Sequence, residues 1–230
     1  MSKSGLHTPG KIGNSRVIPS ASSGQAPSER EARVEGSPSR MESCAPVLGI
    51  LLAAGSGSRF GGAKLLAALD DGAMIGERAL ANLTAGVDAV LAVVRPGDDA
   101  LARSMAHGGA RVTVCANAAD GMGDSLAWGV RAAPVVKGWV VALADMPWTT
   151  SETIARIADA LRGGALLAAP SHRGVRGHPV AISARYFSDL CALSGDEGAK
   201  RVLAANAESL TLIETDDPGV VRDVDLRSDL

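Results

Sequence analysis

The sequence predicts an α/β fold of three layers, with helices on both faces of a mostly parallel β-sheet. From residue 47 onward, short apolar runs alternate with segments of helical periodicity, which is the pattern of β-α-β units. A hydrophobic content of 46% is sufficient to fill the core between such layers. A glycine-rich turn follows the first apolar run, at the place where parallel sheets bind their ligands.

The expected elements follow this alternation along the chain. The run Val47–Leu51 is apolar throughout, as a strand buried on both faces should be. By the same reasoning strands are expected at 47–53, 88–94, 111–115, 138–144, 165–169, 179–183 and 209–213. Helices are expected near 74–85, 97–106, 123–133, 150–162, 184–192 and 197–206. The residues Thr149-Thr150-Ser151-Glu152 offer a capping box for the helix at 150–162. The later strands are less regularly spaced, which allows antiparallel members such as 179–183.

The first part of the chain differs from the rest. Residues 1–45 are rich in Ser, Gly, Pro and Arg and have little apolar periodicity, so we expect a disordered extension there. Met41 stands just before the first strand and offers an alternative translation start. The folded domain is therefore expected over residues 46–230.

Composition limits the classes of partner. The net charge of −2 gives no basic field for nucleic acid or an anionic membrane. No apolar run is long enough to span a bilayer. Cys44, Cys115 and Cys191 are far apart and form no metal-ligand or redox spacing, so free thiols in a reducing compartment are expected. These features together predict a cytoplasmic protein.

Residues 52–64, with the sequence Leu-Ala-Ala-Gly-Ser-Gly-Ser-Arg-Phe-Gly-Gly-Ala-Lys, form the first candidate site. A glycine-rich turn after a strand exposes backbone N–H groups that can hold a polyphosphate, and Arg59 and Lys64 add two cations. The loop is not a Walker loop, because Ala63 precedes the lysine and Leu65 replaces the hydroxyl residue. It is not a dinucleotide fingerprint either, because Phe60 stands at the third glycine position.

Carboxylates provide the second candidate site. Asp145 follows the apolar run 139–144 and should emerge at the carboxyl end of a strand, where it could bind Mg²⁺ or simply cap a turn. Near the C-terminus, Asp223 and Asp225 flank Val224, and alternation in a strand would direct both to one face. They could complete a metal site with Asp145, or form a solvated acidic turn.

The loop pattern Leu-x-Ala-Gly-x-Gly-x-Arg-x-Gly-x-x-Lys resembles the signature of nucleotidyltransferases that activate sugars, alditols and cofactors. Together with Ala-Asp-Met-Pro at 144–147 and Asp-Val-Asp at 223–225, it is similar to the molybdenum cofactor cytidylyltransferase family and its molybdopterin guanylyltransferase relatives. The segments 121–126, 177–180 and 195–200 strengthen this resemblance, which spans about residues 47–230. It implies a Rossmann-like sheet of the nucleotide-diphospho-sugar transferase type.

The resemblance also implies roles for individual residues. The catalytic residues would be Arg59, Lys64 and Asp145. Nucleotide binding would involve Leu52, Ala53, Ala54, Gly55, Gly57, Arg59, Lys64, Gly123, Asp124 and Ser125. The acceptor would meet Gly177, His178 and Pro179, and Mg²⁺ would bind Asp145 with Asp225, more than Asp223, from the closing motif. Alanine at position 54, where guanylyl relatives usually have glycine, favours CTP over GTP.

The implied reaction is transfer of CMP from CTP to the terminal phosphate of molybdopterin, with release of pyrophosphate. The product would pass to a recipient molybdoenzyme or its chaperone. Two alternatives stay open on the sequence. One is a cytidylyltransferase, or another NTP transferase, acting on a sugar phosphate or an alditol phosphate. The other is a non-catalytic nucleotide-binding module.

Overall fold

The computed structural model describes residues 45–230. The expected N-terminal extension, apart from its last residue, and Met41 lie outside the described residues. The strands are β1 (Val47–Leu52), β2 (Ala89–Val94), β3 (Arg111–Val114), β4 (Gly138–Leu143), β5 (Leu167–His172), β6 (Val175–Arg176), β7 (Val180–Ser183) and β8 (Leu210–Glu214). The α-helices are α2 (Ile75–Gly86), α3 (Asp99–His107), α4 (Met122–Ala132), α5 (Ser151–Arg162), α6 (Phe187–Cys191) and α7 (Lys200–Ala205).

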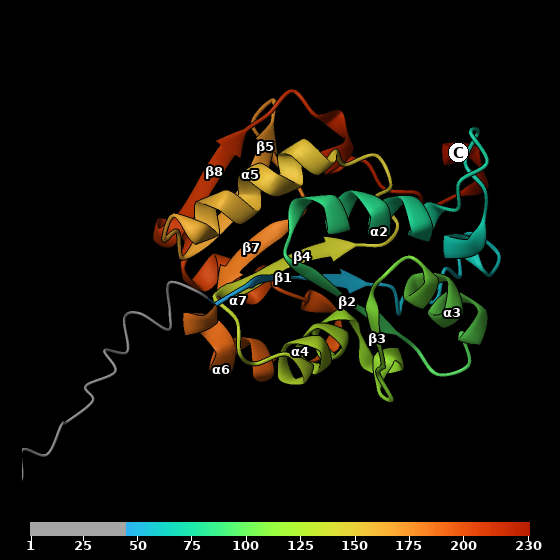
Figure 1. Ribbon diagram of the computed structural model, residues 1–230, viewed down its shortest axis with the longest axis horizontal. Coiled ribbons are helices and arrows are strands. Elements are labelled where there is room, and N and C mark those ends of the chain that lie inside the picture. Colours follow the sequence, from blue (N-terminus) through green and yellow to red (C-terminus); the bar gives the residue numbers. More distant parts are fainter. Residues whose placement is uncertain (1–44) are drawn as a thin grey trace, which may run out of the picture. The chain divides into compact units, whose positions relative to one another are not determined.

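The strands form one mixed sheet in the order β3-β2-β1-β4-β7-β5-β6, with β8 paired to β5 (Figure 1). The strands β3, β2, β1 and β4 run parallel, and so do β5 and β8. The strand β7 is antiparallel to both of its neighbours, β4 and β5. The predicted α/β class with a mostly parallel sheet is confirmed, including an antiparallel strand at 179–183.

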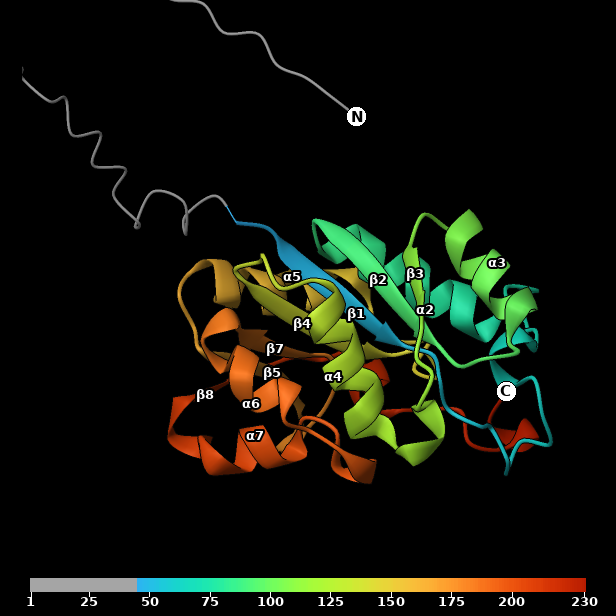
Figure 2. The same ribbon diagram turned by 90° about the horizontal axis from the view of Figure 1, so that it is seen from below.

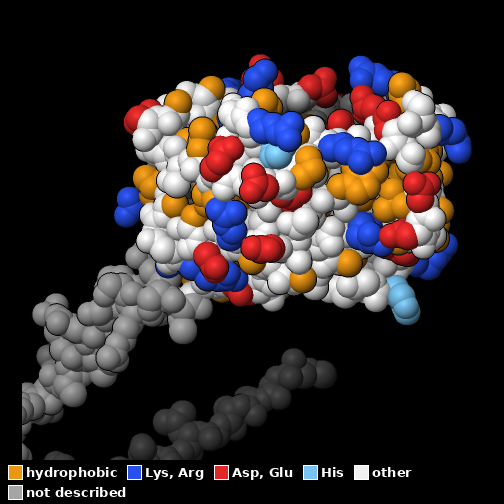
Figure 3. Space-filling model, turned by 90° about the horizontal axis from the view of Figure 1, so that it is seen from above, with side chains coloured by type: hydrophobic (Ala, Val, Ile, Leu, Met, Phe, Trp, Pro, Cys, Tyr) orange, Lys and Arg blue, Asp and Glu red, His pale blue; other side chains and the backbone are white. Residues whose placement is uncertain are grey.

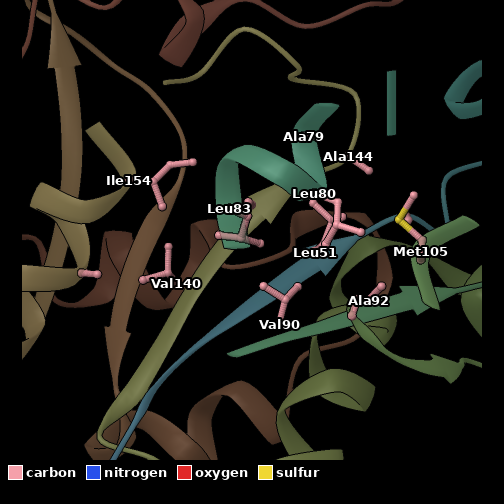
Figure 4. Packing of buried hydrophobic residues seen from close by; sticks show 14 of the residues in the cluster. Leu51, Ala79, Leu80, Leu83, Val90, Ala92, Met105, Val140, Ala144 and Ile154 are labelled. Carbon is pink, nitrogen blue, oxygen red and sulfur yellow. The ribbon is translucent and has the colours of Figure 1, made fainter. Parts of the chain in front are cut away.

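Helices cover both faces of the sheet (Figure 2). On one face α2, α3 and α5 pack on alternate residues of the central strands, such as Leu51 of β1 and Val90 of β2. Figure 4 shows Leu80 and Leu83 of α2 directed toward these two side chains. On the other face α4, α6 and α7 cover the remaining positions, including Ile50. Because both faces are buried, the central strands are apolar at nearly every position.

Local structure differs from the sequence prediction at the beginning of α5 and before α6. The helix expected at 184–192 starts as a 3₁₀ turn, Ala184–Tyr186, before α6. The capping box expected at Thr149–Glu152 is wrong, because Thr150 is the N-cap and its hydroxyl accepts the Thr153 N–H. Thr149 instead donates its hydroxyl proton to the Gly219 carbonyl, 3.0 Å away. A contact distant in sequence therefore sets where α5 begins.

Gly219 belongs to the segment of residues 217–221, through which the C-terminal part of the chain returns to the edge of the sheet. The carboxylate of Asp217 is 9% exposed and accepts the backbone N–H groups of Thr150 (2.8 Å) and Gly219 (2.9 Å). A Cβ atom at Gly219 would lie 2.2 Å from the Trp148 carbonyl oxygen, so only glycine permits this approach. Asp217 and Gly219 thereby fix residues 217–221 against the loop that follows β4.

The structure of residues 45–230 tests several expectations that were drawn from the composition. Cys115 and Cys191 are free thiols, as predicted, and Cys44 lies outside residues 45–230. Within that range no helix has the length and apolar character needed to cross a membrane. Figure 3 shows acidic and basic side chains interspersed on the face that it draws, which agrees with the near-neutral net charge.

We expect Asp217→Ala to lower the free energy of unfolding by about 2–4 kcal/mol, because the buried N–H of Gly219 and the N–H of Thr150 lose their acceptor. Urea denaturation followed by circular dichroism measures the change. The control is Asp216→Ala, since Asp216 is exposed and should cost less than about 0.5 kcal/mol. Equal effects of the two substitutions would contradict the role given to Asp217.

Candidate active site

Three chain segments meet at one edge of the sheet. The strands β1 and β4 are parallel neighbours with Leu52 paired to Leu143, so the loops that follow them emerge side by side. The C-terminal segment joins them through the Val224 N–H, which donates to the Asp145 carbonyl at 2.9 Å. Figures 1 and 2 both show this segment, in red, beside the loop after β1.

The glycine-rich loop doubles back toward the end of β1. Gly57 (φ 57°), Gly61 (φ 89°) and Gly62 (φ 101°) adopt left-handed conformations that favour glycine. Between them, Phe60 is 3% exposed and belongs to a small cluster with Ile75 and Val224. The buried ring anchors an otherwise exposed loop, and the reversal brings Lys64 back to the sheet edge.

The predicted carboxylates come together. Asp145, Asp223 and Asp225 each offer an oxygen atom, and these atoms lie within 4.8 Å of one another. Residues 223–225 do not form the expected strand, because no neighbouring strand pairs with them. Alternation still applies, since the side chain of Val224 is buried in the small cluster and its two neighbours face the opposite way. Oxygen ligands of this kind suit Mg²⁺ or Mn²⁺.

Two cations contact this acidic group. The Nζ atom of Lys64 lies 2.8 Å from Oδ2 of Asp145, 2.8 Å from the Val224 carbonyl oxygen and 3.8 Å from Oδ1 of Asp225. Nη1 of Arg59 lies 3.0 Å from Oδ2 of Asp225. The side chain of Lys64 is 12% exposed and that of Arg59 is 78% exposed. Lys64 is therefore part of the floor of the site, whereas Arg59 can turn toward a ligand at little cost.

An open cavity of about 640 Å³ lies beside this group. Predicted site residues that line it are Leu52, Ala54, Gly55, Gly57, Lys64, Ser125 and Asp145. The cavity therefore extends from the glycine-rich loop to the carboxylates and to the amino end of α4.

Other predicted nucleotide residues do not line this cavity. Ala53 is 1% exposed and packs in the core. The carboxylate of Asp124 accepts the side-chain amide of Asn117 (2.8 Å) and the Gly195 N–H (2.7 Å). Gly123 also faces this contact, since a Cβ atom there would lie 2.9 Å from the Gly195 carbonyl oxygen. Asp124 and Gly123 therefore connect the amino end of α4 to the segment near Gly195, and both segments contribute to the wall of the cavity.

The predicted acceptor residues form a separate group. Gly177, His178 and Pro179 are outside the lining of the large cavity, and His178 and Pro179 line a smaller hollow against α2 and α5. Burial lowers the pKa of His178 below its ordinary value of 6.5, and Arg176 lowers it further, while Asp145 acts in the opposite sense. The imidazole is therefore neutral at pH 7, and its buried Nδ1 has no hydrogen-bond partner among residues 45–230.

Sequence reasoning missed part of the cavity wall. Unpredicted lining residues include Arg95 and Pro96 after β2 and Ala116 and Ala118 after β3. Nε of Arg95 donates to Oδ2 of Asp98 at 2.9 Å, which fixes the guanidinium at the rim. The positions after β2 and β3 could have been found by treating the residue after every parallel strand as a candidate.

A loop that can hold a phosphate chain beside clustered carboxylates suits chemistry at a nucleotide phosphate. On an α/β sheet of this topology, that combination defines the class of nucleotidyltransferases. The chain belongs to the family described as the MobA-like NTP transferase domain, which matches residues 49–210. This membership confirms the family resemblance inferred from the sequence.

Known relatives carry different names. The chain is 31% identical to Nicotine blue oxidoreductase of Paenarthrobacter nicotinovorans, over 78% of this chain and 92% of that protein. It is 32% identical to Purine catabolism protein PucB of Bacillus subtilis (strain 168), over 78% of this chain and 91% of that protein. The crystal structure of Rv0371c from Mycobacterium tuberculosis H37Rv superposes with a TM-score of 0.69 at 26% identity, covering 80% of this chain and 95% of that one. That protein has also been solved in complex with manganese.

The position of Lys64 leads to a prediction about metal binding. Its ammonium and a divalent cation compete for the same carboxylate oxygens, so Lys64→Met should tighten Mn²⁺ binding in the absence of nucleotide by about 10-fold. Electron paramagnetic resonance of free Mn²⁺ measures the affinity. Lys137→Met, at the amino end of β4 and away from the site, should leave it unchanged. Unchanged or weaker binding by Lys64→Met would show that the ammonium does not compete.

Proposed function

We propose that this NTP transferase transfers CMP from CTP to the terminal phosphate of molybdopterin and releases pyrophosphate. The observation that carries the proposal is the meeting of Lys64 and Arg59 with the carboxylates of Asp145, Asp223 and Asp225 at the end of the glycine-rich loop. This arrangement serves the transfer of a charged phosphoryl group, which needs positioning and neutralisation of negative charge.

The loop and its cations would bind the triphosphate. Gly55, Gly57 and Lys64 line the cavity, which supports binding of the phosphates by the backbone N–H groups of this loop and by the ammonium group. Arg59 is exposed, and its ion pair within residues 45–230 is with Asp225, so its guanidinium could move onto the phosphates. Both cations would then stabilise the departing pyrophosphate.

The carboxylates of Asp145, Asp223 and Asp225 fit a divalent cation, because oxygens from all three converge. We propose Mg²⁺, which when bound would neutralise charge on the α-phosphate and orient the attacking oxygen. No general base is required, because a phosphate monoester is already an oxyanion at neutral pH.

Selection of the nucleotide would depend on residues beside the base. The methyl group of Ala54 lines the cavity and would crowd a purine more than a pyrimidine, which supports CTP. Ser125 would contact the nucleoside from the amino end of α4. Gly123 and Asp124 would act indirectly, by holding the segment near Gly195 in the cavity wall.

The acceptor side would include Gly177, His178 and Pro179. His178 and Pro179 line a hollow together with Leu143 and Met146, which flank Asp145 in the chain, and this supports an acceptor position close to the carboxylates. A neutral imidazole can donate one hydrogen bond to an acceptor phosphate. A recipient molybdoenzyme or its chaperone would then take up the product. Because relatives about 30% identical carry unlike names, family membership alone does not select the acceptor.

The direct test is pyrophosphate release from each of the four NTPs with Mg²⁺, with and without molybdenum-loaded molybdopterin. Release from CTP only when that acceptor is present would support the proposal. Release from CTP only with a sugar phosphate or an alditol phosphate would replace the acceptor. CTP binding without release with any of these acceptors would indicate a nucleotide-binding module.

Asp145→Ala should reduce pyrophosphate release by about 10²- to 10³-fold or more, since it removes a metal ligand. The fold should be retained, because the side chain of Asp145 is 27% exposed and fills no core position. Circular dichroism and the initial rate are measured on the same preparation. Asp189→Ala, on the exposed surface of α6, is the control and should keep full activity. Near-normal activity of Asp145→Ala would rule out its role.

Ala54→Gly should raise the kcat/KM for GTP relative to that for CTP by about 10-fold, the scale that one methyl group contributes. Competition between the two nucleotides measures the ratio. Ala53→Gly is the matched control, because the Ala53 side chain lies in the core and should leave the ratio unchanged. An unaltered ratio for Ala54→Gly would contradict the crowding argument.

A further inference from the structure

The chain after the carboxylate cluster forms a turn that touches the backbone of Asp225. Oδ2 of Asp229 accepts the N–H of Asp225 at 2.9 Å and the N–H of Leu226 at 2.6 Å. The N–H of Asp229 donates in return to the Leu226 carbonyl at 3.1 Å. One carboxylate oxygen therefore closes the turn of residues 225–229.

This turn is fastened to the glycine-rich loop. Nη2 of Arg222 donates to the carbonyl of Asp229 at 3.1 Å. The guanidinium of Arg227 lies 4.8 Å from the centre of the Phe60 ring, in a cation–π contact. Phe60 in turn packs with Val224, the residue that precedes Asp225. The turn is thus held at both ends against elements of the site.

Asp225 has no regular structure to hold it. In the described part of the chain no strand pairs with residues 223–225, so a β-ladder does not fix the direction of the Asp225 side chain. The hydrogen bond from its N–H to Asp229 supplies the missing restraint. With the backbone fixed, the Asp225 carboxylate faces Nη1 of Arg59 at 3.0 Å and Nζ of Lys64 at 3.8 Å.

We propose that Asp229 is a positioning residue of the cation site, which orients the carboxylate of Asp225 through the backbone N–H bonds of Asp225 and Leu226. The proposal rests on the proposed function, because it takes the three clustered aspartates as ligands of a divalent cation. Asp229 itself is not one of the clustered aspartates. Partners that orient metal ligands commonly contribute about 10- to 100-fold in metal affinity.

Three substitutions of Asp229 distinguish two explanations of its effect on metal binding. One is orientation of Asp225 through hydrogen bonds, and the other is attraction of the cation by the negative charge of Asp229. Asp229→Asn keeps an oxygen acceptor and removes the charge, Asp229→Glu keeps the charge and displaces the acceptor, and Asp229→Ala removes both. Positioning predicts that the Asn variant binds Mn²⁺ within about 3-fold of the parent chain, while the Ala variant binds about 10-fold more weakly and the Glu variant lies between them. Attraction of charge predicts the opposite order for Asn and Glu.

The experiment measures Mn²⁺ affinity of the full chain by electron paramagnetic resonance, without nucleotide, and pyrophosphate release as a function of Mg²⁺ concentration. Asp71→Ala is the matched control, since Asp71 also accepts a backbone N–H, that of Ala73, and contacts none of the clustered aspartates. It should leave Mn²⁺ affinity unchanged. In the Asp229→Ala variant the Mg²⁺ concentration for half-maximal rate should rise more than kcat falls.

The outcomes are distinct. Weaker Mn²⁺ binding by the Ala variant, with near-parental binding by the Asn variant, would support the positioning role. Parental Mn²⁺ binding by all three variants would overturn it and leave the proposed function intact. Absence of Mn²⁺ binding by the parent chain would overturn the cation site, and the positioning role with it. Should the Ala variant fail to fold, the comparison of Asn with Glu still decides between positioning and charge.

Discussion

The arrangement of the site depends on one ammonium group. Lys64 contacts Asp145, 81 positions away, and the Val224 carbonyl, 160 positions away. These contacts join the glycine-rich loop, the end of β4 and the C-terminal segment at a sheet edge where backbone pairing ends. Without a cation at this point, the clustered carboxylates would repel one another, and the irregular segment carrying Asp225 would lose a main restraint.

The contacts of Lys64 link the stability of the site to its binding of ligands. The contacts that keep the carboxylates together are made by the same lysine that, in the proposed function, would bind the triphosphate. A ligand that recruits Lys64 would leave the acidic group in need of another positive charge, which a divalent cation would supply. In the proposed function, nucleotide and metal would therefore favour each other. Arg59, which is exposed and has one carboxylate partner, can adjust at lower cost.

In the proposed function, specificity would depend on a different part of the molecule from the phosphate chemistry. The glycine-rich loop and Asp145 lie within residues 49–210, which match the MobA-like NTP transferase family. The cavity wall is instead made by loops after β2 and β3 and by the segment near Gly195, which Asp124 ties to α4. Loops of this kind tolerate change without disturbing the sheet, which explains how relatives with the same framework can carry unlike names.

The sequence by itself determined the elements whose signals are local. Apolar runs defined the central strands because strands buried on both faces need apolar residues, and the glycines of the phosphate loop were visible because few other residues adopt their backbone angles. Asp145 was found because it follows such a strand. Only the tertiary structure decided that Thr150, not Thr149, caps α5, that Asp124 binds another loop, and that Arg95 and Ala116 face the cavity. These outcomes depend on contacts between segments that are distant in the sequence. The residue pattern within one segment does not identify which other segment it will contact.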